Sequence, residues 1–139
     1  MKRLILAAAL ALAPLAALAE APPAPVSLPL GAFDQTMTGQ PLTVPTGALQ
    51  VRVSKTTIPV GAMLPPHKHP YPRYAYILEG EIEVTNLETG LVARFKAGDF
   101  AIESRDQWHK GQAVGDKAAV LLVIDQAPPG AANVVMKAP

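Results

Sequence analysis

The chain has 139 residues, a formal net charge of +1 and no cysteine, and 17% of its residues are charged. A chain without cysteine forms no disulfide and carries no lipid attached at a cysteine. A net charge this close to zero argues against nucleic acid or an anionic membrane as the natural partner.

The first nineteen residues have the features of a secretory signal peptide. Lys2 and Arg3 supply the positive start, residues 4–18 are an uncharged Ala/Leu-rich run, and Ala17-Leu18-Ala19 gives a small-x-small cleavage pattern. The run is too short to span a membrane comfortably, so a membrane anchor is the weaker alternative. Cleavage would leave 120 residues with 10 basic and 11 acidic side chains, which suits one domain. We expect a periplasmic or secreted protein without membrane contact after cleavage.

Beyond the signal peptide, the pattern is that of an all-β domain. Residues 20–27 form a Pro/Ala-rich linker, and residues 28–139 are expected to form one domain in which prolines before residue 45 favour short edge strands. Short alternating runs separated by turns are typical of a sandwich or barrel. Ile82 and Val84 should face inward, and Tyr74 and Tyr76 should share a face. We expect strands at 49–58, 73–78, 81–85, 91–95, 100–103, 108–114 and 118–125.

All three histidines of the chain fall in two glycine-led stretches, residues 61–80 and 98–109. His67 and His69 are two residues apart, and side chains at that spacing on a strand point to the same face. A His-x-His pair alone is more often solvated or packed than bound to metal. The third histidine, His109, at the end of the second stretch, is what favours a metal site.

The first stretch, GAMLPPHKHPYPRYAYILEG, resembles the first sequence motif of the cupin superfamily. That motif is a glycine, five residues, His-x-His, three or four residues, a glutamate, six residues and a second glycine. The matching positions are occupied by Gly61, His67, His69 and Gly80. Arg73 stands where the family has its glutamate.

The second stretch, GDFAIESRDQWH, resembles the second cupin motif, which is a glycine, five residues, Pro-x-Gly, two residues, a histidine, three residues and an asparagine. Gly98 and His109 match it. Ser104 replaces the proline, Asp106 the glycine and Ala113 the asparagine. The resemblance therefore extends from about residue 42 to residue 125, with degenerate motifs in the right order.

This resemblance implies a single cupin domain, that is, a jelly-roll antiparallel β-barrel. It also implies that His67, His69 and His109 bind one divalent metal ion and leave positions on it open for water or substrate. Imidazole suits Zn, Cu, Fe and Ni, whereas the carboxylate that would help Mn is missing from the first motif. One ion among Zn, Cu, Fe, Ni and Mn is expected. The alternative is a decayed cupin whose histidines only line a cavity.

Arg73 and Tyr71 are candidate substrate-binding residues. A guanidinium matches a carboxylate or phosphate, so Arg73 could hold an anionic group while the same molecule reaches the metal. The simpler expectation is that Arg73 turns outward with its charged head in water. Tyr71 shares the parity of the histidines, although prolines on both sides disturb that count.

Two further residues near the histidines are expected to bind neither metal nor substrate. Glu103 is expected to be solvated rather than to replace the missing ligand. Trp108 is expected to be a barrel-packing residue rather than a substrate platform. Because adjacent strand residues face opposite ways, Trp108 and His109 should not both point into one cavity.

Three functions compete. The first is a metal-dependent enzyme resembling quercetinase-like cupins, either a dioxygenase-like oxidoreductase or an isomerase. The second is a non-catalytic module that binds a small molecule such as a sugar or an organic anion. The third, a structural domain that lost its site, is disfavoured by the retained histidines. No catalytic residue can be assigned because a fold does not fix a function. A homodimer is compatible with the sequence.

Overall fold

The computed structural model describes residues 22–138, and the predicted signal peptide, residues 1–19, lies outside this range. The described residues form strands and loops, and no helix among them is long and apolar enough to cross a membrane. The strands are β1 (Gln50–Ile58), β2 (Met63–Lys68), β3 (Arg73–Glu79), β4 (Glu81–Asn86), β5 (Val92–Lys96), β6 (Phe100–Ile102), β7 (His109–Val114), β8 (Ala119–Ala127) and β9 (Val135–Met136).

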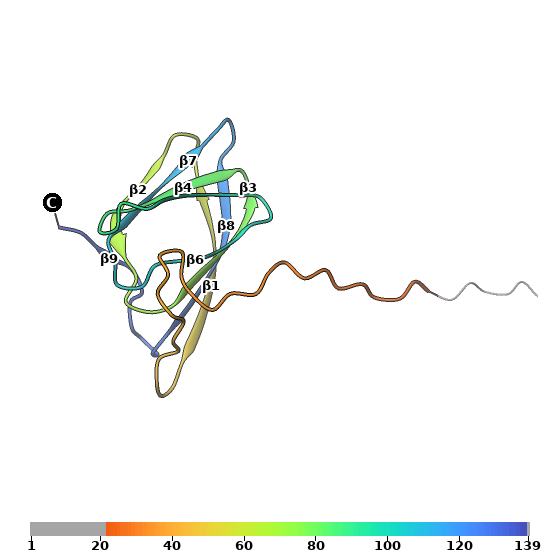
Figure 1. The fold of residues 1–139 in the computed structure, drawn as a ribbon, viewed down its shortest axis with the longest axis horizontal. Helices are drawn as coiled ribbons and strands as arrows, with labels where there is room; N and C mark the ends of the chain where they lie inside the picture. The colour runs from red at the N-terminus through yellow and green to blue at the C-terminus, as the bar shows by residue number, and fades with distance from the viewer. Residues whose placement is uncertain (1–21, 139) are drawn as a thin grey trace, which may run out of the picture.

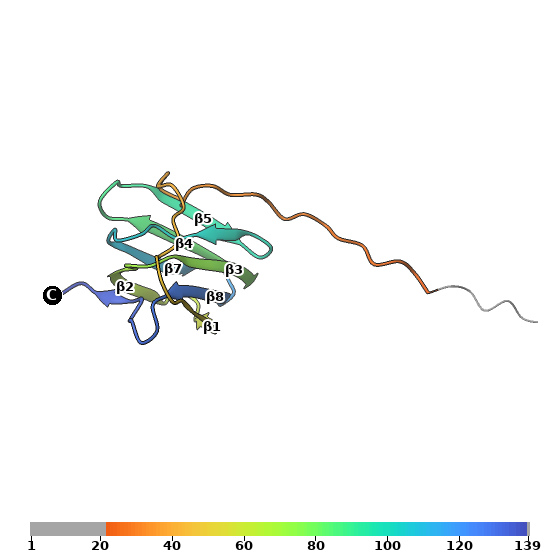
Figure 2. The same ribbon diagram turned by 90° about the horizontal axis from the view of Figure 1, so that it is seen from below.

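The strands form two sheets that face each other and enclose one interior (Figure 1). One sheet has four strands in the order β1-β8-β3-β6, and the other has five in the order β5-β4-β7-β2-β9. Every pairing within the sheets is antiparallel. Figure 2 shows the same strands from below, with the N-terminal segment leaving the body of the domain. The predicted all-β, jelly-roll architecture is confirmed.

Alternation along the strands decides which side chains enter the interior. In β4, Ile82 and Val84 are buried while Glu81 and Glu83 are only half-buried, as the sequence predicted. Across the interior, Ile77 and Val123 belong to the same apolar cluster, so the two sheets share one core. Burial of these branched side chains is the main force that holds the sheets together.

Gly80, at the tight connection between β3 and β4, is a position that only glycine fits. Its φ is 70°, in the left-handed region, and a Cβ there would lie 2.2 Å from the carbonyl oxygen of Ala118. Neither the backbone angle nor that distance is compatible with a side chain. The glycine therefore lets β4 begin directly after β3 ends.

The segment before β1 is less regular than predicted. Short edge strands were expected between residues 26 and 45, but the structure has a single bridge there, between Gln35 and Pro41. The segment is nevertheless attached, because the amide of Met37 donates to the carbonyl of Ile102 at the end of β6. Met37 thereby reaches the core and contributes to the lining of the central cavity.

Trp108 was expected to pack against the barrel, and it does so at the outer surface. Its side chain is half-buried at the surface, and the ammonium groups of Lys68 and Lys137 lie 5.1 and 5.8 Å from its ring centre. Both distances are within the range of a cation–π contact. The alternation argument itself was sound, since His109 is buried and its neighbour Trp108 faces away.

Candidate metal centre

The three histidines meet at one end of the interior. His67 lies in β2 and is the direct partner of His109, the first residue of β7. His69 follows β2 and forms a bridge with Arg105, in the connection between β6 and β7. The three ring centres are 4.5 to 4.9 Å apart, and all three side chains are buried. Residues that are distant in sequence are thus brought together by the pairing of β2 with β7.

Each imidazole is oriented by a backbone carbonyl on its Nδ1 atom. Nδ1 of His67 lies 2.7 Å from the carbonyl oxygen of Pro65, and Nδ1 of His109 lies 2.9 Å from that of Gln107. Nδ1 of His69 lies 2.6 Å from the carbonyl oxygen of Asn133. A carbonyl only accepts, so Nδ1 must carry a proton and donate it. In the neutral rings the Nε2 lone pairs are then free for another partner.

Glu103, which follows β6, places its carboxylate against these Nε2 atoms. One of its oxygens lies 3.0 Å from Nε2 of His69 and 3.2 Å from Nε2 of His109. Its side chain is only 15% exposed. The expectation that Glu103 is solvated was therefore wrong. Its backbone explains the placement, because its amide donates to the carbonyl of Arg73 at the start of β3.

When the rings are neutral and protonated on Nδ1, these short contacts are not hydrogen bonds. Nε2 of His69 and Nε2 of His109 are buried and have no partner with hydrogen-bond geometry, although a carboxylate oxygen is close to both. Lone pairs of two neutral imidazoles and a carboxylate repel one another unless a cation lies between them. The donor atoms of His67, His69, Glu103 and His109 all lie within 4.8 Å of one another, which is close enough to share one metal ion. These residues fit a divalent metal.

Protons compete with a metal at this site. Burial lowers the pKa of His67 to about 4, and the neighbouring histidines act in the same direction. Burial alone would lower the pKa of His109, but the Glu103 carboxylate outweighs it and raises that pKa. Burial alone would raise the pKa of Glu103, but His109, His69 and Arg73 hold it well below its usual range. The site therefore keeps a carboxylate and, without metal, tends to hold a proton on His109.

The simpler expectation, that Arg73 turns outward into water, was wrong. Its guanidinium forms a two-pronged pair with Asp125 on β8, with Nε to Oδ1 and Nη2 to Oδ2 both at 2.8 Å. Its pKa is raised: burial opposes this, but Asp125 and Glu103 favour the charged form. Asn133 supports the pair through its side-chain amide, which donates to Asp125, while its backbone carbonyl holds His69. The arginine pair and the histidine cluster are thus linked through one residue.

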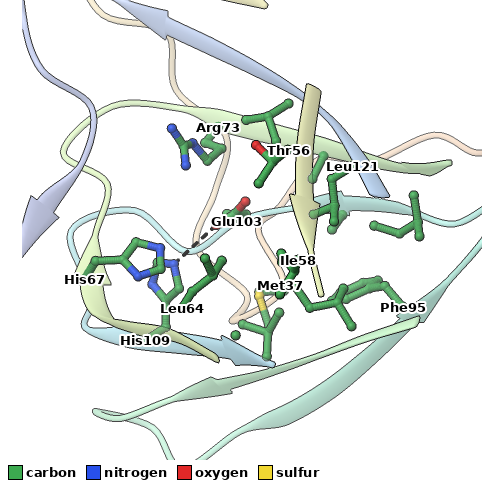
Figure 3. Close-up of a pocket in the computed structure, with 17 residues that line it drawn as sticks. Met37, Thr56, Ile58, Leu64, His67, Arg73, Phe95, Glu103, His109 and Leu121 are labelled. Atoms are coloured by element: carbon green, nitrogen blue, oxygen red, sulfur yellow. Dashed lines mark ion pairs between the residues drawn. The ribbon is translucent and has the colours of Figure 1, made fainter. Parts of the chain in front are cut away.

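A cavity of about 50 Å³ runs from the histidines into the apolar core (Figure 3). His67, Glu103, His109 and Arg73 line its polar end, and Figure 3 shows them grouped on one side of it. The remaining lining is apolar except for Thr56. This volume holds roughly three to five water molecules, so it admits only a small ligand. Tyr71 does not contribute to it and instead lines a surface groove with Pro70 and Arg105.

Three residues of this arrangement were not found from the sequence as parts of the site. Glu103 had a usable signal, because it lies in the second histidine-containing stretch next to the position of the motif proline. Asp125 and Asn133 had none that we can identify, since they lie 52 and 60 residues beyond Arg73. Only the pairing of β3 with β8 and the return of the chain after β8 bring them to the site.

Comparisons with known proteins agree with this geometry. The family model described as the cupin domain matches residues 54–125, slightly more than half of the chain. An uncharacterised conserved protein with a double-stranded β-helix domain from Klebsiella pneumoniae is 26% identical and covers 62% of this chain and 69% of its own, with a TM-score of 0.52. No curated protein sequence matches the chain.

Two enzymes are structural neighbours with a lower sequence identity. The DMSP lyase of Ruegeria pomeroyi is 24% identical, with a TM-score of 0.54 over 63% of this chain and 43% of its own. The oxalate decarboxylase of Lactobacillus farciminis is 22% identical, with a TM-score of 0.54 over 62% of this chain and 26% of its own. The chain thus spans less than half of either enzyme, and likeness at this level shows the fold alone.

Proposed function

This chain belongs to the cupin domain family, and on that premise we propose that it holds one divalent metal ion at the four-residue cluster described above. The single observation that carries the proposal is the pair of buried, unpartnered Nε2 atoms facing a buried carboxylate. A metal ion resolves that electrostatic conflict for both rings at once, whereas a proton on His109 leaves Nε2 of His69 without a partner. The Nδ1 contacts to backbone carbonyls orient the rings in advance, as second-layer partners of metal-bound histidines do.

The donor set is compatible with all five metals that the sequence suggested. The carboxylate that was expected to be missing is supplied by Glu103 from the other motif, so Mn is no longer disfavoured on that ground. Three imidazole nitrogens and one carboxylate oxygen suit Zn, Cu, Ni, Fe and Mn.

We also propose that the protein is exported across a membrane, as residues 1–19 predict. The mass of the protein isolated from its native source tests whether cleavage follows Ala19.

The charges around the cavity favour a small organic anion as the ligand. A divalent ion and the Glu103 carboxylate together carry a charge of +1, while Arg73 and Asp125 neutralise each other. The guanidinium has Nη1 outside its contacts with Asp125, so it can still donate to a ligand oxygen. A monocarboxylate would complete the balance, and the cavity volume limits it to a few non-hydrogen atoms.

We propose that the protein is a metal-dependent oxidoreductase or isomerase acting on such an anion. A bound metal would supply Lewis-acid chemistry and, if redox-active, electron exchange. The described residues contribute binding and orientation: Arg73 can donate to the anion from Nη1, Thr56 can donate or accept one hydrogen bond, and the apolar lining excludes water. A non-catalytic anion-binding module is the second candidate, because Arg73 and Thr56 are the only polar lining residues outside the metal-binding cluster and neither is a base at neutral pH.

Titration calorimetry of the chelator-treated protein tests both the metal site and the anion-binding role of Arg73. Glu103→Gln should lower metal affinity at least tenfold, because it removes the charged donor, whereas Glu83→Gln on the outer face of β4 should leave it unchanged. The double variant Arg73→Gln, Asp125→Asn removes both charges of the neutral pair. It should keep metal affinity within about twofold and lose binding of formate, acetate, glycolate and oxalate.

The results separate the alternatives. Equal metal affinity in the wild type and Glu103→Gln would contradict the metal site. Equal anion affinity in the wild type and the double variant would contradict the role of Arg73. Turnover of a bound anion, followed by NMR of the solution, supports the enzyme, while binding without turnover for every metal supports the binding module.

A further inference from the structure

Two side chains separate the central cavity from a second, larger pocket. This outer pocket has a volume of about 400 Å³, and its lining includes Phe33, Phe100 and Ile102. Met37 and Phe95 line both the outer pocket and the central cavity, and no other described residue does. In Figure 3, Phe95 lies at the end of the cavity opposite His67, and Met37 lies between them. The side chains of Met37 and Phe95 therefore form the wall between the two spaces.

The wall lies at a seam where the edges of the two sheets come together. Strand β5 is an edge of the five-stranded sheet and β6 is an edge of the four-stranded one, and no ladder joins them. Phe95 belongs to β5 and Phe100 to β6, so the outer pocket lies over this seam. Where two sheets meet without backbone pairing, side chains alone close the interior.

The backbone of Met37 is held in place at the seam. Its amide donates to the carbonyl of Ile102, at the end of β6, with a distance of 2.8 Å. The amide of the preceding residue, Thr36, donates to the carbonyl of Gln40, also at 2.8 Å, which closes the loop on itself. The loop thus positions Met37 through its backbone and leaves the side chain free of polar contacts.

The side chain of Met37 is held by packing against the buried apolar cluster. Methionine is unbranched and has three rotatable side-chain bonds, so it can change its rotamer while its backbone hydrogen bonds stay in place. Every other apolar side chain that lines the central cavity belongs to a strand, where the ladder fixes its position. Met37 is therefore the part of the lining that a ligand or a substitution can displace most easily.

We propose that Met37 sets the length of the ligand that the central cavity accepts. This inference rests on the small-anion site proposed above and names the residue that keeps the ligand small. With the Met37 side chain in place, the cavity of about 50 Å³ holds a carboxylate near Arg73 and only a short chain behind it. When that side chain is removed, the tail of a longer carboxylate continues past Phe95 into the outer pocket. The substrate class that follows is the short monocarboxylates.

The outer pocket has the chemistry that an aliphatic tail requires. The rings of Phe33 and Phe100 lie with their centres 5.7 Å apart, and Phe95 and Ile102 add further apolar surface. No charged side chain is among the described residues that line it. Each methylene that is fully buried against such a lining strengthens binding about fourfold. A tail of a few methylenes, even when partly exposed, should therefore give a measurable gain in affinity.

Titration calorimetry of the metal-loaded protein with acetate, butyrate and hexanoate tests this limit. The wild type should bind acetate and should bind hexanoate at least tenfold more weakly. Met37→Ala removes every side-chain atom beyond Cβ, so it should bind hexanoate at least tenfold more tightly than the wild type and acetate within about threefold. Met63→Ala is the matched control and should behave like the wild type, because Met63 is 52% exposed on β2 and lines neither space.

Two further variants separate a limit on ligand length from general damage to the core. Met37→Leu keeps a side chain of similar volume and should exclude hexanoate as the wild type does. The double variant Met37→Ala, Phe33→Asp adds a negative charge to the outer pocket. It should bind hexanoate at least fivefold more weakly than Met37→Ala alone and acetate equally well, because only the longer tail reaches Phe33. A cooperative thermal transition in each variant shows that it is folded.

The uncharged probe 1-hexanol distinguishes this inference from the proposed function, because it needs neither a metal nor an anion site. In NMR titrations of the metal-free protein, hexanol should shift the signals of Leu64 and Phe95 in Met37→Ala and leave them unchanged in the wild type. If no variant binds acetate, the anion site is contradicted, and hexanol alone decides whether Met37 closes the cavity. Equal binding of hexanoate and hexanol by the wild type and Met37→Ala would overturn the inference, as would exclusion of both probes from Met37→Ala.

Discussion

At the scale of single residues, the orientation of the imidazoles is determined partly by hydrogen bonds to neighbouring residues in the sequence. His67 and His109 each donate from Nδ1 to the carbonyl two residues earlier, Pro65 and Gln107 respectively. His69 instead depends on Asn133, far along the chain. Two of the three ring orientations therefore follow from local backbone geometry, and the third exists only once the C-terminal segment is in place.

The lowered pKa of His67 predicts a pH dependence of the metal-free protein. Its pKa falls from 6.5 in the unfolded chain to about 4 in the native state. Between these values only the unfolded chain takes up the proton, so stability is present above pH 6.5 and decreases as the pH falls toward 4. The decrease in the free energy of unfolding should be up to about 3 kcal/mol.

Urea unfolding with excess chelator, at pH values from 7 to 4, measures this dependence. The titration of Glu103 and His109 does not produce the same loss of stability between pH 6.5 and 4.5. The raised pKa of His109 adds stability that is already complete below its unfolded value, and the lowered pKa of Glu103 matters only below its own unfolded value. His67→Gln should therefore flatten the slope between pH 6.5 and 4.5. A variant as pH-sensitive as the wild type there would show that another group is responsible.

At the scale of elements, the connection between β6 and β7 decides whether the site forms. It carries Glu103 at its start and delivers His109 at its end. A buried polar network holds it: the side-chain amide of Asn86 donates to Gln107 at 3.0 Å and to Ser104 at 3.3 Å, and Thr38 bonds both acceptors from the other side. Such a network stabilises one geometry when every member is paired.

Removing Asn86 should therefore weaken both stability and metal binding. Asn86 is fully buried, and its side-chain oxygen Oδ1 also accepts from the backbone amides of Glu88 and Thr89. We expect Asn86→Ala to lower the free energy of unfolding by about 2–3 kcal/mol, since several buried groups lose their partner. Metal affinity should fall roughly tenfold through misplacement of Glu103 and His109.

Thr85→Ala is the matched control for Asn86→Ala. Thr85 is the preceding residue of the same strand, is half-buried on the outward face and has no side-chain hydrogen bond in the described structure. Chemical denaturation and calorimetry of both variants give the comparison. Normal metal affinity in Asn86→Ala would mean that the connection keeps its shape without this network.

The strands were predictable because their signal is local. Alternation and turn residues located 81–85 and 91–95 within a residue or two of β4 and β5. The structure of the segment before β1 was harder to predict. Its proline content predicts edge strands but does not say whether the edge of a neighbouring strand is free to pair. Strand β2 was implied only by the spacing of His67 and His69 and was given no bounds, because it contains two prolines. Strand β9 was not expected, since it is two residues long and depends on β2.

The site was only half predictable for a related physical reason. Histidine spacing on β2 indicates a shared face, and the three histidines do meet. The partners of charged side chains depend on which strands are neighbours, and that is a property of the topology. Arg73 was expected to turn to water because no partner for it was visible in the sequence. Its register partner on β8, Asp125, provides one.

At the scale of the whole molecule, the two sheets share one interior but differ in the chemistry of their outer faces. Their inner faces share one core, and the metal cluster lies where they meet at one end of it. Their outer faces differ, with charge on one and apolar side chains on the other. The four-stranded sheet thus contributes Arg73 to the cavity, and its apolar outer face takes no part in the site.

The metal should also act as a clamp between the sheets. His67 and His109 belong to the five-stranded sheet, whereas Glu103 follows β6 of the four-stranded one, so an ion held by all of them joins strands that share no backbone hydrogen bonds. Binding to the native state alone stabilises it by about 2.7 kcal/mol at a concentration 100 times the dissociation constant. For a domain of this size that corresponds to a rise in Tm of roughly 10 °C.

Differential scanning calorimetry with Zn, Mn, Ni, Cu and Fe measures the clamp. At least one of these ions should raise Tm by that amount and keep a single transition, because both sheets would unfold together. Mg should not, since it prefers an octahedron of oxygen ligands and this site offers three imidazoles. In Glu103→Gln the rise should shrink to less than half, because the ion would remain attached to one sheet only. An equal rise with Mg, or an undiminished rise in Glu103→Gln, would contradict a clamp built from both sheets.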